Sequence, residues 1–92
     1  MLIGVTVVSL AVAPSAKADD AAFVQVLADN GIRVTGSPLL IGNEGRQICA
    51  FATNYGYTAS ALRYVPIGNH PGMTDGQADK FVALAMETYC PS

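Results

Sequence analysis

Positive charge is scarce in this sequence, whose 92 residues include five lysines and arginines against seven aspartates and glutamates. The basic residues stand singly along the chain, with none next to another. A nucleic-acid site needs clustered lysine and arginine to neutralise phosphates. The sequence therefore excludes nucleic acid as a partner, and we interpret Arg33, Arg46, Arg63 and Lys80 as solvated surface charges.

Motifs for catalysis and metal binding are also missing. His70 is the only histidine, and Cys49 and Cys90 do not form a C-x-x-C pair, so the donor clusters of a zinc site are absent. A Ser-His-Asp system would require partners brought together by the fold alone. We interpret Asp75, Asp79 and Glu87 as solvated side chains on a polar helix face; a glycosidase pair of carboxylates is the alternative, and nothing in the sequence singles one out. We expect no enzyme, no metal and no cofactor.

Long apolar runs are limited to one, at the N-terminus. Residues 2–13 are uncharged and apolar, too short to span a bilayer but of the length found in secretion signals. Pro14 and Ser15 break the run, and Ala16-Lys17-Ala18 supplies the small residues that signal peptidase accepts. We predict a signal peptide over residues 1–18, a mature domain over residues 19–92, secretion or retention in the cell envelope, and no membrane span after cleavage. The alternative is that residues 2–13 form a buried element of the domain.

The two cysteines are expected to pair, because an exported protein matures where disulfides form and persist. A bond between Cys49 and Cys90 closes a loop of about 40 residues. Such a loop restricts the unfolded chain by roughly 4 kcal/mol in the loop-entropy model.

Four helices are predicted in the mature chain. The first runs over about residues 20–30, with acidic residues at its start and Gly31 as its left-handed stop. Ser37 and Pro38 indicate the start of the second, although Gly42 and Gly45 weaken it; its clearer part surrounds Cys49 and it ends near residues 54–56.

The third and fourth predicted helices have clear caps. Thr58 begins a short helix that Pro66 stops, and a loop with Gly68 and His70 follows. Thr74 and Gln77 form a capping box for the last helix, which runs to about Cys90. With almost no alternating β pattern, the fold class is all-α, a compact bundle of about four short helices stapled by one disulfide. The expected core contains Phe23, Leu27, Phe51, Leu62, Phe81 and Leu84, and we also expect Leu39, Leu40 and Ile41 to open an apolar helix face.

Tyr55, Tyr57 and Tyr64 form a candidate binding surface, because tyrosine combines apolar area with a polar tip and is enriched in interfaces. The sharper interpretation places them in a groove with Leu62 and Val65. The simpler one is that they shield the edge of a thin core.

The residues resemble a known family, the small exported mycobacterial proteins described as domain of unknown function 732. The resemblance is carried by Asp20-x-x-Phe23-Val24-x-x-Leu27 with Gly31-Ile32, by Gly45-x-x-Ile48-Cys49, and most specifically by Thr74-x-x-Gln77-Ala78-x-x-Phe81-Val82 through Tyr89-Cys90-Pro91. It implies secretion, a helical fold and the disulfide, and it transfers no active-site residue.

Two functions from different classes remain as hypotheses. The first is an exported binding or interaction module that acts on a protein of the envelope or of a host. The alternative is a carrier of a small apolar ligand such as a lipid, which would need a dry cavity of roughly 300 Å³ or more between the helices. We favour the first, because the large side chains of so small a domain are needed to fill its core.

Overall fold

A computed structural model describes residues 19–90 of the chain. The predicted signal peptide and its cleavage after Ala18 lie outside these residues. The described part is all-α and contains no strand, as the sequence predicts. Its helices are α2 (Asp20–Asp29), α3 (Pro38–Tyr55), α4 (Ala59–Leu62), α5 (Tyr64–Asn69) and α6 (Asp75–Tyr89).

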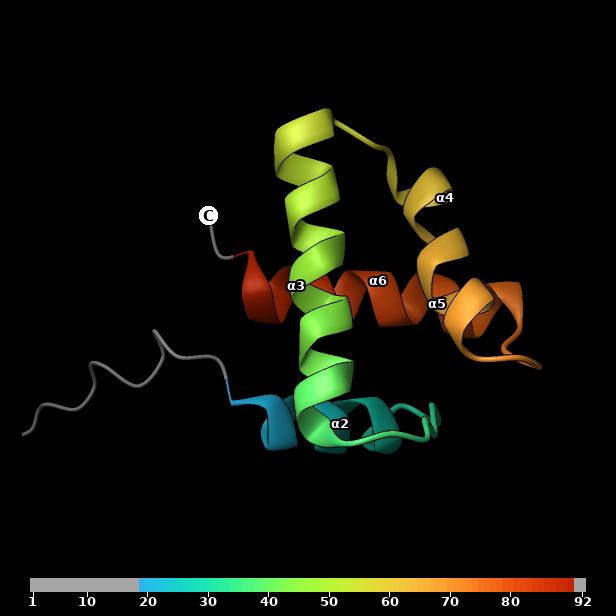
Figure 1. The fold of residues 1–92 in the computed structure, drawn as a ribbon. Helices are drawn as coiled ribbons and strands as arrows, with labels where there is room; N and C mark the ends of the chain where they lie inside the picture. Colours follow the sequence, from blue (N-terminus) through green and yellow to red (C-terminus); the bar gives the residue numbers. More distant parts are fainter. Residues whose placement is uncertain (1–18, 91–92) are drawn as a thin grey trace, which may run out of the picture.

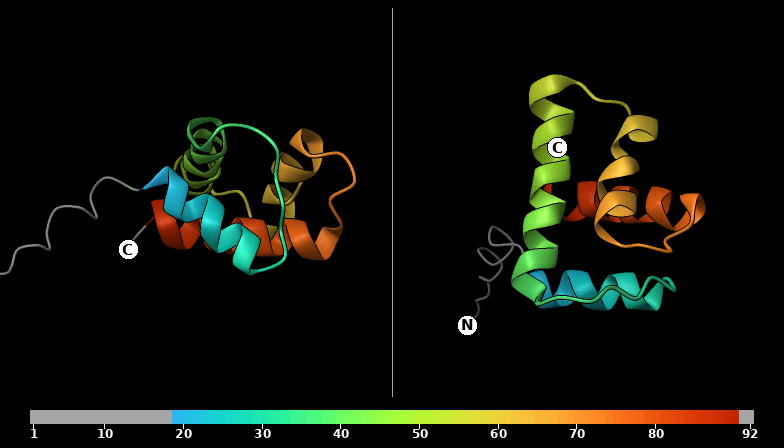
Figure 2. Two further views of the ribbon diagram at one scale, coloured as in Figure 1. Left: turned by 90° about the horizontal axis from the view of Figure 1, so that it is seen from below. Right: turned by 45° about the vertical axis from the view of Figure 1, so that its right-hand side comes forward.

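The long helix α3 organises the domain. In Figure 1, α2 packs across the N-terminal end of α3, and α6 crosses behind its middle. The short helices α4 and α5 pack against α6 and run back beside α3 (Figure 2). Apolar side chains of α2, α3, α4 and α6, together with Ile32 in the loop after α2, meet in one buried core, which contains Phe23, Leu27, Ile32, Ile41, Ile48, Leu62, Ala78, Phe81, Val82 and Ala85. None of the helices described is long and apolar enough to cross a membrane.

Most predicted helix ends are confirmed. The Asp19 side chain accepts hydrogen bonds from the backbone of Ala21 and Ala22, and the Thr74–Gln77 capping box is present. Gly31 adopts φ +80° after α2, and the Ile32 N–H donates to the Leu27 carbonyl at 2.9 Å. This 6→1 bond is the signature of a Schellman motif, in which the residue after the turn folds back on the helix.

The predicted stop at Pro66 is wrong. Pro66 lies in the first turn of α5, and the following glycine and asparagine continue that helix rather than forming a loop. Proline fits there because first-turn amides have no intrahelical acceptor to lose. Arg63 keeps helical backbone angles, φ −59° and ψ −25°, so that α4 and α5 follow one another almost directly.

Two further expectations about apolar residues are corrected. Leu39 and Leu40 lie 60% and 63% exposed, because helical spacing places them outside the face of α3 that Ile41, Gly45 and Ile48 bury. Phe51 and Leu84 are only partly buried and pack against the edge of the core.

Gly42 and Gly45, which the sequence marks as weak points of α3, are the places where other elements approach it most closely. A Cβ atom at Gly42 would collide with the carboxylate of Asp20. A Cβ atom at Gly45 would lie 2.5 Å from Cε2 of Tyr89 and 3.3 Å from Cε2 of Phe23. Both glycines therefore weaken the helix locally, but the absence of a side chain allows α2 and α6 to pack closely against α3.

Gly45→Ala is expected to lower the free energy of unfolding by about 1–3 kcal/mol, because the new methyl group must displace Tyr89. Helix propensity alone predicts the opposite sign, a gain of about 1 kcal/mol. Gly76→Ala in α6 is the matched control, since its Cβ would meet nothing within 4 Å, and it should be neutral or slightly stabilising. Urea unfolding measures both variants. A Gly45→Ala protein more stable than wild type would contradict this packing.

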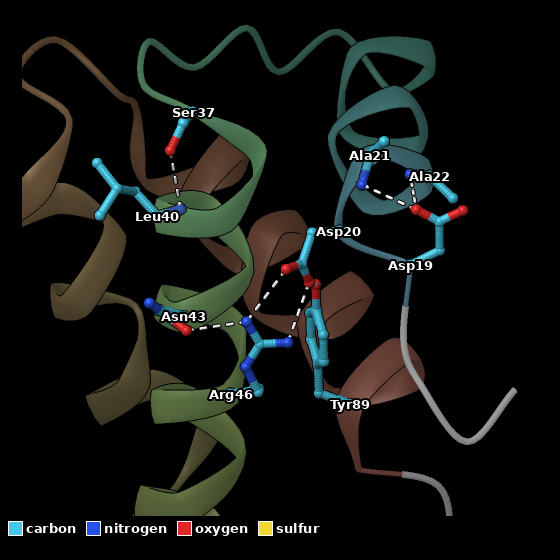
Figure 3. A network of polar contacts seen from close by, with 9 residues as sticks. All are labelled: Asp19, Asp20, Ala21, Ala22, Ser37, Leu40, Asn43, Arg46 and Tyr89. Atoms are coloured by element: carbon cyan, nitrogen blue, oxygen red, sulfur yellow. Dashed lines mark hydrogen bonds and ion pairs between the residues drawn. The ribbon is translucent and has the colours of Figure 1, made fainter. Parts of the chain in front are cut away.

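Polar contacts tie the same three helices together (Figure 3). Arg46 on α3 donates two hydrogen bonds to the carboxylate of Asp20 on α2, at 3.0 and 3.1 Å. The Tyr89 hydroxyl on α6 donates to the same carboxylate at 2.6 Å, and the Arg46 guanidinium lies 5.1 Å from the centre of the Tyr89 ring. Hydrogen bonds from Arg46, and then from Tyr89, hold the pKa of Asp20 below its ordinary value. Burial, with the bond to Asp20, raises the pKa of Tyr89.

Two of the arginines interpreted as solvated charges are in fact paired. Arg46 belongs to the network just described. Arg63 donates to both carboxylate oxygens of Asp79, at 2.9 Å each, and lies 3.5 Å from a carboxylate oxygen of Asp75. The helix packing brings these charges together across 16 and 26 positions of sequence, so that spacing along the chain did not reveal them.

The predicted disulfide is present. Cys49 in the middle of α3 is bonded to Cys90, the C-cap residue of α6, with a Cα–Cα distance of 5.5 Å. The bond holds the end of α6 against α3 and keeps Tyr89, the preceding residue, beside Gly45.

Candidate functional site

Three aromatic rings gather where α3 ends. Gly56 adopts the left-handed conformation, φ +69°, and turns the chain back, so that the Tyr57 N–H donates to the Phe51 carbonyl. The turn places the ring of Tyr57 5.8 Å from that of Phe51 and 5.9 Å from that of Tyr55. We call Phe51, Tyr55 and Tyr57 the aromatic surface.

The aromatic surface is exposed although its rings are mutually packed. Tyr55 is 67% exposed and Tyr57 is 53% exposed, while Phe51 packs against the core and anchors the other two. In Figure 1 and in the right panel of Figure 2, this end of α3 projects beyond α2 and α6. The tyrosines therefore present rigidly supported apolar area to solvent at the far end of the molecule from α2.

The chain around the aromatic surface carries no charge. Between Arg46 and Arg63 there is no charged side chain, and residues 53–61 are all exposed. Their side chains are those of threonine, asparagine, tyrosine, alanine and serine, with one glycine. An exposed surface rich in tyrosine and small neutral polar residues is typical of antibody binding loops.

Tyr64, the third tyrosine of the predicted surface, lies apart. It is 66% exposed on α5 and forms no ring pair with Tyr55 or Tyr57 within residues 19–90. The predicted groove is not formed either, since Leu62 is buried in the core at 2% exposure and Val65 is partly buried against it. The structure thus brings together two of the three predicted tyrosines and adds Phe51, which the sequence placed in the core.

The structure also contains a polar pair, His70 and Glu44, that the sequence did not predict. His70, expected in a loop, is only 13% exposed in its side chain, and its Nε2 lies 2.7 Å from Oε1 of Glu44 on α3. The His70 ring packs 5.9 Å from that of Phe81. A signal for this pair exists in the sequence: Glu44 occupies the buried stripe of α3 that Ile41, Gly45 and Ile48 define at helical spacing.

Two open clefts meet at His70. One of about 690 Å³ lies between the start of α3 and the end of α5, and the other, of about 300 Å³, lies between the loop after α2 and the loop before α6. Polar side chains form part of the wall of each cleft, and neither cleft is an enclosed apolar cavity. Within residues 19–90 no group of three or more histidine, cysteine, aspartate or glutamate side chains is arranged to hold a metal ion.

Comparison with known proteins gives one match. No curated protein and no solved structure matches the chain. A family model described as a protein of unknown function, DUF732, matches residues 18–92, which include the whole described domain. The match agrees with the resemblance carried by the motifs around Phe23, Cys49 and Phe81. The chain therefore belongs to the DUF732 family of proteins of unknown function.

Proposed function

We propose that this protein is an exported binding module that engages another protein through the aromatic surface. The observation that carries the proposal is the exposure of Tyr55 and Tyr57, at 67% and 53%, on a surface that the core does not require for its own closure. Tyrosine gives a binding surface large contact area at low conformational-entropy cost, because its side chain has two rotatable angles. The proposal gives the domain a binding role and no catalytic one.

The chemistry of the surface favours a partner with a neutral, partly apolar docking face. The aromatic surface lies in a stretch without charged side chains, and the nearest charged residue along the chain after it, Arg63, is bound to Asp79. Neutral polar groups around packed aromatic rings resemble the buried centre of protein interfaces, which is depleted in charge. The partner would be a protein of the producing cell's envelope or of a host.

Export is part of the proposal and has two supports. Residues 1–18 have the pattern of a signal peptide with cleavage after Ala18, and the disulfide is of the kind that persists outside the cytosol. Cleavage at that point leaves Asp19, the N-cap residue of α2, as the first residue of the mature chain. The mature protein would thus begin with the side chain that caps its first helix.

The alternative function, a carrier of a small apolar ligand, has weaker support. An apolar cargo of lipid size requires an enclosed, mostly apolar cavity. The two clefts at His70 are open and carry polar residues such as Asn43, Gln47 and Gln77 in their walls. The aromatic surface is therefore the better supported site for an apolar contact.

Photo-crosslinking tests the proposed function in the cell that exports the protein. The photoreactive residue p-benzoylphenylalanine is placed at position 57 or, as the control, at position 25 in α2. Helix α2 packs at the opposite end of α3 from the aromatic surface (Figure 1). We expect a discrete crosslinked protein at position 57 that is absent at position 25 and is identified by mass spectrometry. Crosslinks that are equally strong at both positions, or absent at both, would refute the proposed surface.

A further inference from the structure

The larger cleft at His70 differs in chemistry from the aromatic surface. Its volume of about 690 Å³ lies within the range of small-molecule sites. One part of its wall is apolar, formed by Ile41 and by Leu40, which is 63% exposed. The side-chain amides of Gln47 and Asn69 form another part. Apolar walls with a few available polar groups are the usual composition of a ligand site.

Glu44 supplies a buried carboxylate to this cleft. Its side chain is 7% exposed, and Oε1 accepts a hydrogen bond from His70. The other oxygen, Oε2, is buried and has no hydrogen-bond partner within residues 19–90. A carboxylate can accept about four hydrogen bonds, and leaving a buried charged acceptor unpaired is costly. The structure thus contains an acceptor that lacks a donor, on a side chain that forms part of the cleft wall.

The basic group nearest to this carboxylate along α3 is already occupied. Arg46 also lines the cleft, but its guanidinium donates to both oxygens of Asp20 and to Oδ1 of Asn43. Its charge is therefore balanced by Asp20 and not by Glu44. His70 can donate one N–H to Glu44 and satisfies only one of the two oxygens.

We propose that this cleft binds an organic cation, a primary ammonium group on an aliphatic stem. The ammonium group, a compact charge with three donors, bonds Oε2 of Glu44, and the stem lies against Leu40 and Ile41. Because Oε2 is buried, binding requires the carboxylate to rotate about its terminal torsion, which is broad in glutamate, until an oxygen faces the cleft. A free alkylamine and the lysine side chain of a peptide present the same chemistry. This site is separate from the aromatic surface, and its failure would leave the proposed function standing.

The test is a titration of the oxidised, ¹⁵N-labelled protein, followed by the amide signals of the cleft residues. The probes are n-butylammonium, N-acetyl-lysine methylamide for the peptide source, and n-butanol as the neutral control. We expect saturable shifts at Glu44, Gln47 and His70 with at least one of the two cations and none with butanol. The cation that binds more tightly identifies the source. Shifts that do not saturate, or that butanol reproduces, would overturn the proposal.

Two variants assign the binding to the carboxylate. Glu44→Gln keeps the size of the side chain and should weaken cation binding about tenfold or more, as expected for loss of a charged hydrogen bond. Asp29→Asn removes the same charge from an exposed position on α2 and should leave the affinity unchanged. If circular dichroism shows that Glu44→Gln does not fold, Leu40→Ala is the deciding variant. Its exposed side chain contributes only to the contact with the stem, so its removal should weaken cation binding without unfolding the domain. Unchanged affinity in the deciding variant refutes the site.

Discussion

Replacement of Phe81 by alanine is expected to abolish the cooperative thermal unfolding of the domain. Phe81 is fully buried and packs edge-on against Phe23, with ring centres 5.6 Å apart, and its ring also contacts His70. Removing a buried phenylalanine typically costs about 3–5 kcal/mol. The core of so small a domain rarely supplies more than about 3–5 kcal/mol, so the loss matches most of the stability available.

Circular dichroism during heating provides the measurement for Phe81→Ala. Leu39→Ala is the matched control, since Leu39 is 60% exposed and its truncation should change the free energy of unfolding by no more than about 0.5 kcal/mol. A Phe81→Ala transition close to that of wild type would show that the helices do not close around this residue.

Loss of the disulfide should be nearly as damaging. The bond joins residues 41 positions apart, and a loop of this length restricts the unfolded chain by about 4 kcal/mol. In a domain of this size, that free energy corresponds to a fall in Tm of roughly 15–30 °C. The double variant Cys49→Ser, Cys90→Ser should show this fall in a thermal scan.

Reduction of the wild-type protein with dithiothreitol is the control for the double variant. It breaks the same bond without changing the sequence, and it should lower the Tm by the same amount. A fall of only a few degrees in both samples would mean that the packing of Tyr89 against Gly45 already holds α6 in place.

Local signals in the sequence were sufficient for most helix boundaries. The Thr74–Gln77 capping box, the turn at Gly31 and the Ser37–Pro38 start are set by residues close together in the chain, and all three are present. The prediction at Pro66 was wrong because a proline is compatible with the first turn of a helix as well as with the position after its end. The helical backbone angles of Arg63 show that the first of these applies here.

The candidate site could be predicted only in part, because its geometry depends on contacts across the fold. Tyr55 and Tyr57 flank the turn at Gly56, so their proximity is local and the sequence indicated it. Tyr64 was grouped with them by residue type, but it lies on another helix. The pairing of Glu44 with His70, 26 positions away, required the packing of α5 against α3 and α6. Similarly, helix propensity marks Gly42 and Gly45 only as weak positions, because the close approach of Asp20 and Tyr89 to them depends on the packing of α2 and α6.

The most direct test of the proposed function is the affinity of the crosslinked partner for wild-type protein and for Tyr57→Ala, measured by calorimetry with purified components. Tyr64→Ala is the control, because Tyr64 is as exposed as Tyr55 and lies outside the aromatic surface. If the surface is the binding site, Tyr57→Ala should weaken binding by about 2 kcal/mol, roughly thirtyfold, while the helical circular dichroism and the affinity of Tyr64→Ala stay unchanged. Equal affinity of Tyr57→Ala and wild type would contradict the assignment of binding to the aromatic surface.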